Sequence, residues 1–285
     1  MLQNITLLID NRLPEANPDA LLKEHGLSIY FELNQEKWLF DVGASGKFAK
    51  NAERLGIDVS GIDHLVISHG HNDHGGGLRN FLSLNEKADI YISDKIPGSR
   101  CFTCRRLEKR AIGIDPRIFD TAPGRFKRVN RNMLAGKDIA LVFSSCRDFP
   151  MPLANKTLSY AMGEEMERPD DFSHEVSIAV QTEKGLVILS ACSHTGVLNI
   201  LESCCNFWNN PVVDKFIGGT HLVEGDFEKE EDIRALAIKM DQKHPSLKLY
   251  TGHCTCDKAM EILKTNMQER LISFYSGMTI PDSHI

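Results

Sequence analysis

Residues 65–77 read LVISHGHNDHGGG, and this stretch decides the fold. Its first three residues form an apolar run typical of a buried strand, and a glycine-rich turn with four ligand-type side chains follows. These side chains are His69, His71, Asp73 and His74. Four polar groups within six residues do not contribute to hydrophobic packing, whereas imidazole and carboxylate groups are common ligands of divalent metals. The stretch therefore predicts a metal site at the end of a strand.

The spacing within this turn suits two neighbouring cations. Histidines two apart on an extended turn, such as His69 and His71, can both face one cation at about 2.1 Å. Asp73 and His74 then point elsewhere and can serve a second cation. Two cations roughly 3.5–4 Å apart can hold a bridging hydroxide and polarise a substrate oxygen.

Three further apolar runs also lead into histidine. Residues 190–194 read SACSH, residues 218–221 read GGTH and residues 251–254 read TGHC. These segments place His194, His221 and His253 after their runs. Neighbouring parallel strands bring the loops at their carboxyl ends together. If the strands are neighbours, the imidazoles converge on one cleft.

The order of apolar runs and helix-like stretches indicates an α/β fold. We expect strands at 5–9, 27–33, 38–42, 65–67, 90–92, 139–143, 176–180, 186–189, 212–217 and 247–250. We expect helices at 45–55, 76–84, 195–208, 227–244 and 257–267. Strands come first as a meander and then alternate with helices. This order predicts two sheets packed face to face with helices on their outer surfaces.

Composition excludes several classes of protein. The chain has 285 residues, of which 42% are hydrophobic and 25% charged, so disorder is excluded. No apolar run approaches the roughly 20 residues of a membrane helix, and no secretory leader opens the chain. Eight cysteines in a chain of this length do not make a disulfide scaffold, so we expect a cytoplasmic protein with no membrane partner. The net charge of -6 argues against nucleic-acid binding. The sequence shows neither repeats nor a linker, which predicts a single domain over residues 1–285. The sequence does not indicate the oligomeric state.

One basic segment interrupts this acidic background. Residues 95–131 hold eleven basic and three acidic residues, a net charge of +8. Prolines and glycines interrupt the segment, which fits neither the strand nor the helix pattern, so we interpret it as an insertion or lid. Its charge suits a small anionic substrate, with Arg105, Arg106 and Arg110 as candidate phosphate ligands. A solvated charged face without a ligand is the alternative.

The motifs resemble a known family. Residues 68–76 match the HxHxDH signature of the metallo-β-lactamase superfamily, and residues 40–43, FDVG, resemble the strand-end aspartate of that superfamily. Residues 191–196 (ACSHTG), 218–222 (GGTHL) and 252–255 (GHCT) resemble the branch named for dihydropterin ribofuranosylaminobenzene phosphate synthase. The resemblance implies a four-layer αβ/βα sandwich with a dinuclear metal site at one edge.

The resemblance also implies a ligand set. His69 and His71 would bind one metal, and Asp73 and His74 the other. Farther along the chain, the positions that match the family are His174, which stands one hairpin before Cys192, then Cys192 itself and His253. Cys192 stands where most relatives carry a bridging aspartate. The thiolate either bridges weakly or lies outside the metal shell, with His194 coordinating instead.

Two other polar residues receive supporting roles. Asp41 is expected to accept a proton from the far nitrogen of a ligand histidine and so to fix its tautomer. His221 follows two glycines that let backbone approach a ligand closely. We therefore predict that His221 contacts substrate or transfers a proton, with Asp73 as the other catalytic group.

These observations predict a metal-dependent hydrolase. Two divalent ions, zinc in the first place and iron or manganese as alternatives, would supply a metal-bound hydroxide that attacks an ester or phosphoester. The chain has no GxSxG nucleophile motif to compete with this chemistry. A synthase acting on a pterin and a ribosyl phosphate is a second reading. An iron-containing redox or sensor protein is a third, with contributions from the cysteines Cys101, Cys104, Cys254 and Cys256.

Overall fold

The computed structural model describes residues 1–105, 107–225 and 227–281, and its internal contacts divide the chain into two units. Unit 1 comprises the described residues of 1–130, 157–170 and 275–281. Unit 2 comprises those of 131–156 and 171–274. The single domain expected over residues 1–285 stays a prediction. No helix among the described residues is long and apolar enough to cross a membrane.

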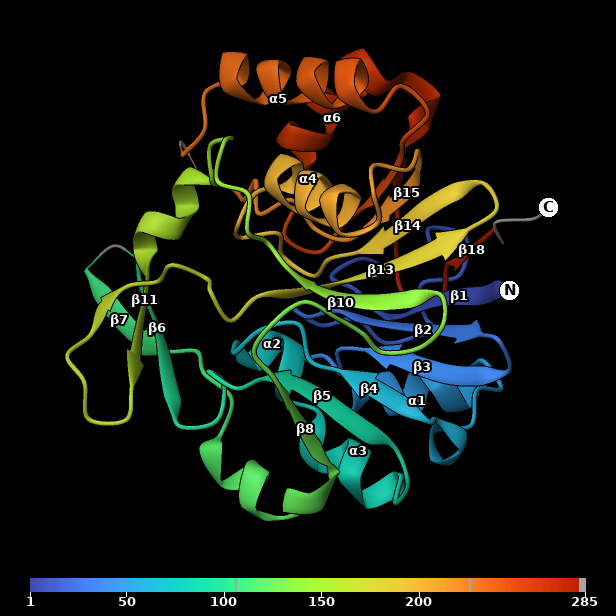
Figure 1. Cartoon of the computed structure of the whole chain (residues 1–285), viewed down its shortest axis with the longest axis vertical. Coiled ribbons are helices and arrows are strands. Elements are labelled where there is room, and N and C mark those ends of the chain that lie inside the picture. Colours follow the sequence, from blue (N-terminus) through green and yellow to red (C-terminus); the bar gives the residue numbers. More distant parts are fainter. Residues whose placement is uncertain (106, 226, 282–285) are drawn as a thin grey trace. The chain divides into compact units, whose positions relative to one another are not determined.

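Unit 1 contains a seven-stranded sheet in the order β18-β1-β2-β3-β4-β5-β8 (Figure 1). Strands β18, β1, β2 and β3 pair antiparallel, and β3, β4, β5 and β8 pair parallel. The change to parallel pairing brings the carboxyl ends of β3, β4 and β5 to one edge. The bounds are β1 (Leu2–Ile9), β2 (Ser28–Leu33), β3 (Glu36–Phe40), β4 (His64–Val66), β5 (Asp89–Ser93), β8 (Phe126–Val129) and β18 (Thr279–Ile280).

Three helices accompany this sheet, α1 (Lys47–Arg54), α2 (Asn72–Gly75) and α3 (Leu78–Leu84). Phe48 of α1 and Phe81 of α3 are fully buried and belong to one apolar core with Leu39 and Ile90 of the sheet. The apolar faces of α1 and α3 therefore cover the sheet. The short η1 (Val59–Gly61) precedes β4.

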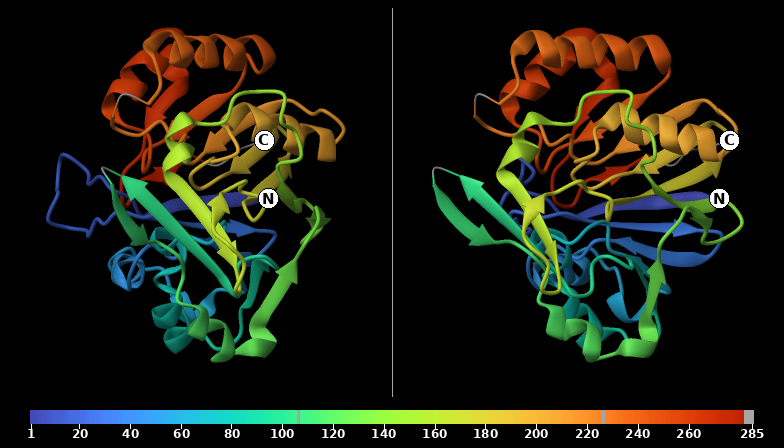
Figure 2. Two further views of the ribbon diagram at one scale, coloured as in Figure 1. Left: turned by 90° about the vertical axis from the view of Figure 1, so that its left-hand side faces the viewer. Right: turned by 60° about the vertical axis from the view of Figure 1, so that its left-hand side comes forward.

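Most of the basic segment, its described residues up to 130, lies in unit 1 and contains regular structure. Strands β6 (Ser99–Arg105) and β7 (Glu108–Ala111) form a hairpin, and β6 also pairs antiparallel with β11 (Leu158–Met162). Figure 2 shows this hairpin in green beside the yellow-green β11. With β12 (Arg168–Pro169) these strands make a four-stranded sheet. Two short 3-10 helices, η2 (Pro116–Asp120) and η3 (Pro123–Arg125), lead from the hairpin into β8. The sequence shows no strand pattern here, because cross-strand pairing with β11 stabilises strands that have no apolar alternation of their own. The interpretation as an insertion or lid stays a prediction.

Unit 2 contains the second seven-stranded sheet, in the order β17-β16-β15-β14-β13-β10-β9. Strands β14 to β17 are parallel neighbours, and β9, β10, β13 and β14 pair antiparallel. The bounds are β9 (Met133–Leu134), β10 (Ile139–Phe143), β13 (Val176–Thr182), β14 (Gly185–Leu189), β15 (Val213–Ile217), β16 (Lys248–Thr251) and β17 (Leu271–Ser273).

The helices of unit 2 are α4 (Val197–Phe207), α5 (Glu230–Lys243) and α6 (Asp257–Met267), and Figure 1 shows them together beside the strands. Leu201, Ala237 and Leu263, one from each helix, share a buried core with Ile188 and Phe216 of the sheet. The short η4 (Leu153–Thr157) and η5 (Gln268–Arg270) complete the elements.

The structure confirms the α/β class and all ten strands that the sequence predicted, with ends shifted by a few residues. All five helices are confirmed, with ends within three residues of those expected. The helix expected at 76–84 begins at Leu78, because the glycines before it form the turn after α2. The parallel strands β14, β15 and β16 are neighbours, as the histidines at their ends required.

Candidate metal centre

The HxHxDH turn follows β4 in unit 1. His71 caps the amino end of α2, so His69 lies on extended backbone before the helix and His74 lies within it. The Nε2 atom of His69 lies 3.1 Å from Nδ1 of His71. The Nε2 atom of His74 lies 3.4 Å from Oδ2 of Asp73. Two ligand atoms about 2.1 Å from one tetrahedral cation are roughly 3.4 Å apart, so both pairs have a spacing that suits shared coordination.

Asp41, which follows β3, connects the turn to the sheet. Its carboxylate is fully buried and accepts hydrogen bonds from the backbone N–H of Ser68 at 2.8 Å and from the Ser68 hydroxyl at 2.7 Å. Nδ1 of His74 lies 2.7 Å from Asp41 Oδ2. Ser68 Oγ also lies 2.8 Å from Nδ1 of His69. Asp41 thus orients His74 directly and His69 through Ser68, and each ring directs its Nε2 lone pair away from Asp41.

The same contacts shift the pKa values of the buried pair. Burial lowers the pKa of His74, but the charges of Asp73 and Asp41 outweigh it and raise that pKa to about 10. Burial raises the pKa of Asp41, although His74 and Ser68 oppose the shift. Without a metal, the proton between Asp41 and His74 therefore stays in the pair at neutral pH.

The glycines after the motif permit close backbone packing. A Cβ atom on Gly76 would lie 2.4 Å from the carbonyl oxygen of Ala44, and one on Gly77 would lie 2.2 Å from that of Val42. Backbone cannot yield to such contacts, so only glycine fits at these two positions. The glycines hold the turn against the loop that carries Asp41.

Unit 2 supplies its polar groups from three separate strand ends. Cys192 follows β14, His221 follows β15, and His253 and Cys254 follow β16. Cys192 Sγ lies 3.3 Å from Nε2 of His253. The rings of His194 and His221 have centroids 4.1 Å apart. Within unit 2 the parallel strands thus bring together the residues that the sequence placed at their ends.

A left-handed backbone occurs at several of these positions. Asp41, His221 and His253 have φ of 61°, 52° and 48°. This conformation costs a residue other than glycine about 1 kcal/mol or more and is concentrated at functional sites.

Two residues that sequence reasoning missed fix the loop of His194. The fully buried carboxylate of Glu175 accepts hydrogen bonds from the backbone N–H groups of His194 at 2.7 Å and of Thr195 at 2.9 Å. Burial raises the pKa of Glu175, and the bonds from Thr195 and His194 oppose that shift. Asn155 Oδ1 lies 3.1 Å from Nδ1 of His194, and Asn155 Nδ2 donates to the His194 carbonyl at 2.7 Å. The only sequence signal for Glu175 was a charged residue directly before an apolar strand.

His174 is buried beside Phe172, with ring centroids 6.1 Å apart. Among the described residues it belongs to none of the clusters of three or more ligand atoms within 4.8 Å of one another. Its coordination stays a prediction.

The predicted phosphate ligands lie on the β6–β7 hairpin. Arg105 ends β6, and Arg110 of β7 is exposed and pairs with Glu108 at 2.6 Å. Arg106 lies outside the described residues. Cys101 of β6 is buried, and burial together with the charge of Asp170 raises its pKa to about 12, so it is a neutral thiol at physiological pH.

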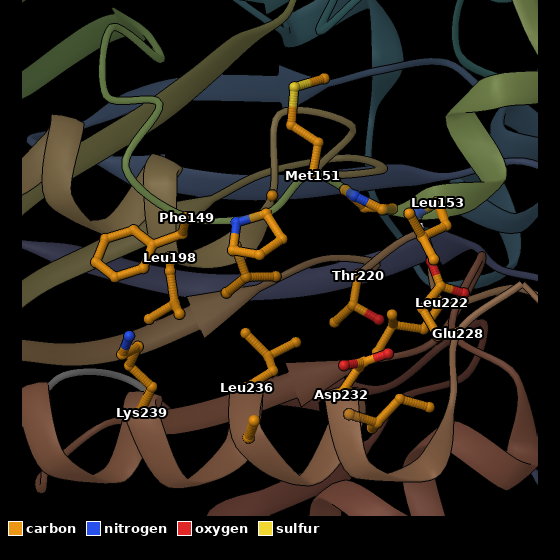
Figure 3. Close-up of a pocket in the computed structure, with 16 residues that line it drawn as sticks. Phe149, Met151, Leu153, Leu198, Thr220, Leu222, Glu228, Asp232, Leu236 and Lys239 are labelled. Carbon is orange, nitrogen blue, oxygen red and sulfur yellow. Dashed lines mark hydrogen bonds between the residues drawn. The ribbon is translucent and has the colours of Figure 1, made fainter.

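An apolar cavity of about 390 Å³ adjoins the strand-end loops of unit 2. Thr220 and Leu222, which flank His221, line it, and so does Leu198 at the start of α4. Figure 3 shows Asp232 and Leu236 reaching into the cavity from α5. The remaining labelled residues are Phe149, Met151, Leu153, Glu228 and Lys239. Such a pocket, with apolar walls and few polar groups, is typical of a site for a small molecule.

The donor set fits divalent metal ions. Imidazole, carboxylate and thiol groups are the ligands of zinc and related cations, and buried polar groups of this density need partners. The orientation of His74 and His69 through Asp41 is the arrangement by which carboxylates position metal-binding histidines.

Comparisons with known proteins agree with this geometry. Residues 23–99 match the sequence profile of the Metallo-beta-lactamase superfamily. A protein of Methanocaldococcus jannaschii named 7,8-dihydropterin-6-methyl-4-(beta-D-ribofuranosyl)-aminobenzene-5'-phosphate synthase is 26% identical over 272 residues, 90% of each chain. The uncharacterized protein MJ0448 of the same organism is 25% identical, over 77% of this chain and 79% of its own.

The crystal structure of Tm1679, described as a metal-dependent hydrolase of the beta-lactamase superfamily, superposes with a TM-score of 0.82. It is 26% identical, and the match covers 99% of this chain and 100% of that one. The resemblance to the superfamily and to the synthase branch that the motifs predicted is therefore confirmed.

Proposed function

We propose that this chain, which has the metallo-β-lactamase fold, is a metal-dependent hydrolase acting on an ester or phosphoester bond of a small anionic molecule. The observation that carries the proposal is the HxHxDH turn with its histidines oriented by the buried Asp41. The polar side chains of this turn do not contribute to hydrophobic packing. Imidazole and carboxylate groups are ligands of divalent cations.

The proposed metal is zinc, with iron or manganese as alternatives, and two ions are expected. When bound, such ions lower the pKa of a water ligand from about 15.7 to roughly 7 and so supply a nucleophile at neutral pH. The sequence predicts as ligands His69, His71, Asp73, His74, His174, Cys192, His194 and His253. The proposal depends on the four of them in the turn after β4, which are His69, His71, Asp73 and His74.

The chain's own residues perform the remaining tasks. Asp41 and Ser68 hold the two histidine tautomers, so that the rings need not reorient on binding. Asp73 is the proposed catalytic carboxylate; its Oδ2 lies 3.3 Å from His25 Nε2 and 3.4 Å from His74 Nε2.

The substrate is proposed to be amphiphilic. The cavity beside His221 takes its apolar part, because its walls are mostly apolar. The carboxylates of Glu228 and Asp232 line that cavity and would repel an anionic group. The arginines Arg105, Arg106 and Arg110 of the basic segment stay predicted ligands of an anionic group.

Metal analysis of the purified protein tests the proposal. We expect about two metal equivalents per chain and hydrolysis of aryl phosphate or carboxylate esters. His71→Ala should lose most of the metal and the activity, whereas His244→Ala, at the end of α5, should retain both. A wild-type protein without metal after refolding in zinc, or an active metal-replete His71→Ala, would contradict the proposal.

A synthase is the second candidate, favoured by the name of the 26% identical relative. In this reading the metals orient a pterin and a ribosyl phosphate for condensation. Incubation with both substrates, with separate measurement of the condensation product and of simple ester hydrolysis, distinguishes the two. An iron-dependent redox or sensor function would instead show stoichiometric iron and a visible absorption band.

A further inference from the structure

The cavity of unit 2 has charged groups at both ends of an apolar body. Its volume is about 390 Å³, which is in the range of pockets for small molecules. Figure 3 shows Glu228 and Asp232 together at one end, and Lys239 with Phe149 at the other. Leu236 lies between these ends. The cavity therefore distinguishes the two ends of a ligand by their charge.

Helix α5 sets the distance between the charged ends. Asp232, Leu236 and Lys239 stand at positions i, i+4 and i+7 of the helix, so they share one face. At a rise of 1.5 Å per residue, the backbones of Asp232 and Lys239 are about 10 Å apart along the helix axis. The ammonium group of Lys239 lies 5.3 Å from the centroid of the Phe149 ring. Its positive charge is therefore held at the Phe149 end and does not neutralise the carboxylates at the other end.

The opposite wall of the cavity, residues 149–153, is fixed by hydrogen bonds at both of its ends. The side chain of Asn199 in α4 donates to the Phe149 carbonyl at 2.9 Å and accepts from the Phe149 N–H at 3.0 Å. The Glu228 carboxylate accepts a hydrogen bond from the Leu153 N–H at 2.6 Å. The wall is therefore formed before a ligand binds, and binding does not have to order it.

The two carboxylates indicate the charge of the ligand. A carboxylate can accept about four hydrogen bonds, so Glu228 can hold the wall and accept from a ligand at the same time. Apolar walls strengthen the attraction between unlike charges relative to bulk water. An alkyl ammonium group has three donors and an ordinary pKa of about 10.4, so it is positively charged at neutral pH. An apolar amine therefore matches both the carboxylates and the apolar body of the cavity.

We propose that the cavity of unit 2 binds a small apolar amine in its protonated form, with the ammonium group at Glu228 and Asp232 and the apolar body against Leu236. The inference rests on the proposed function in one respect, which is that this ligand is the apolar part of the substrate. The substrate then carries a protonated amine on its apolar part in addition to its anionic group. Binding breaks no bond, so it can be measured without turnover.

Three probes that differ in charge test the site. Phenylbutylamine, phenylbutanol and phenylbutyrate share an apolar body and differ in the end group. Titration of the purified full-length protein, followed by NMR of the probe, measures their dissociation constants. The amine should bind about tenfold more tightly than the alcohol, because hydrogen bonds between charged groups are stronger than those of a neutral hydroxyl. The acid should bind most weakly, because the carboxylates of the cavity repel it.

Variants of the cavity locate the bound amine. The double variant Glu228→Gln/Asp232→Asn should bind the amine and the alcohol equally. Glu231→Gln removes a charge from the same first turn of α5 but does not line the cavity, so it should keep the preference for the amine. Leu236→Trp should weaken the binding of all three probes, whereas Ile238→Trp, at an exposed position of the same helix, should not.

His71→Ala separates this inference from the proposed hydrolase. The variant should lose metal and activity but keep the preference for the amine, because His71 does not line the cavity. Loss of the preference in His71→Ala overturns the inference, since the amine would then be a ligand of the metal. Equal binding of amine and alcohol by the wild type, no binding of any probe, or an unchanged preference in the double variant overturns it as well. A protein that prefers the amine but holds no metal would contradict the hydrolase and still support the amine site.

Discussion

The turn after β4 in unit 1 and the strand ends after β14, β15 and β16 in unit 2 present candidate metal ligands in opposite ways. The turn gathers four candidate ligands within six consecutive residues, and one buried carboxylate, Asp41, orients two of them, His69 and His74. The strand ends contribute single residues far apart in the chain, and the parallel sheet brings them together. The first arrangement is local and built on charge, whereas the second depends on topology and contains sulfur.

This difference predicts different responses to mutation. In the turn, loss of one oriented contact affects two histidines at once, because Asp41 holds both His74 and, through Ser68, His69. At the strand ends, Glu175 and Asn155 hold the loop of His194. Perturbations of the turn should therefore be the larger.

Asp41→Asn is expected to have the largest effect. The amide cannot accept hydrogen bonds at both positions, so His74 and His69 lose their fixed tautomers, and metal affinity should fall by about 10- to 100-fold. Competition with a chromophoric chelator measures the change. Asp63→Asn, which removes a surface carboxylate paired with Lys87, is the control and should bind metal normally. Unchanged affinity in Asp41→Asn would show that the turn does not depend on its carboxylate.

Proton release on metal binding should give the next largest effect. The pKa of His74 is raised to about 10, above its ordinary 6.5, so the metal-free folded protein keeps that proton at neutral pH. The raised pKa of His74 contributes to the stability of the folded protein. This contribution is complete below the ordinary pKa of 6.5 and is lost as pH rises through about 10. A metal must displace the proton, so apparent affinity should rise about tenfold from pH 8 to pH 9.

Calorimetry in buffers of different ionisation enthalpy counts the released protons. At pH 8 the wild type should release one proton more than Asp41→Asn, in which one of the two charges that raise the pKa of His74 is absent. Equal proton release by the two proteins would show that Asp41 does not hold the proton on His74.

The contrast between the two regions also explains what the sequence could predict. The contiguous turn could be identified directly, because four ligands in six residues are improbable in a packed core. The convergence of His221 and Cys192 within unit 2 followed from histidines at strand ends, but only on the assumption that those strands were neighbours. Pairing order is a property of the whole sheet, and no local pattern contains it.

Supporting residues were harder to predict for a related reason. Asn155 and Glu175 act on His194 from 39 and 19 residues away, and neither carries a spacing that indicates a partner. The β6–β7 hairpin was missed because exposed strands lack the apolar alternation by which strands are predicted. The support of His194 and the β6–β7 hairpin both depend on contacts between residues that lie far apart in the sequence.

The smallest expected effect concerns the cavity beside the strand ends, which has no counterpart among the residues of the turn. Leu236 lines this cavity from α5, and Leu236→Trp should fill part of its 390 Å³. For substrates with an apolar group, KM should rise by about fivefold, or roughly 1 kcal/mol, while kcat stays constant. Ile238→Trp, at an exposed position of the same helix, is the matched control.

A substrate without an apolar group should be hydrolysed equally well by wild type and Leu236→Trp, because it leaves the cavity empty. If KM for apolar substrates is unchanged while the thermal unfolding temperature is that of the wild type, the substrate does not enter the cavity. That result would remove the cavity of unit 2 from the proposed substrate site.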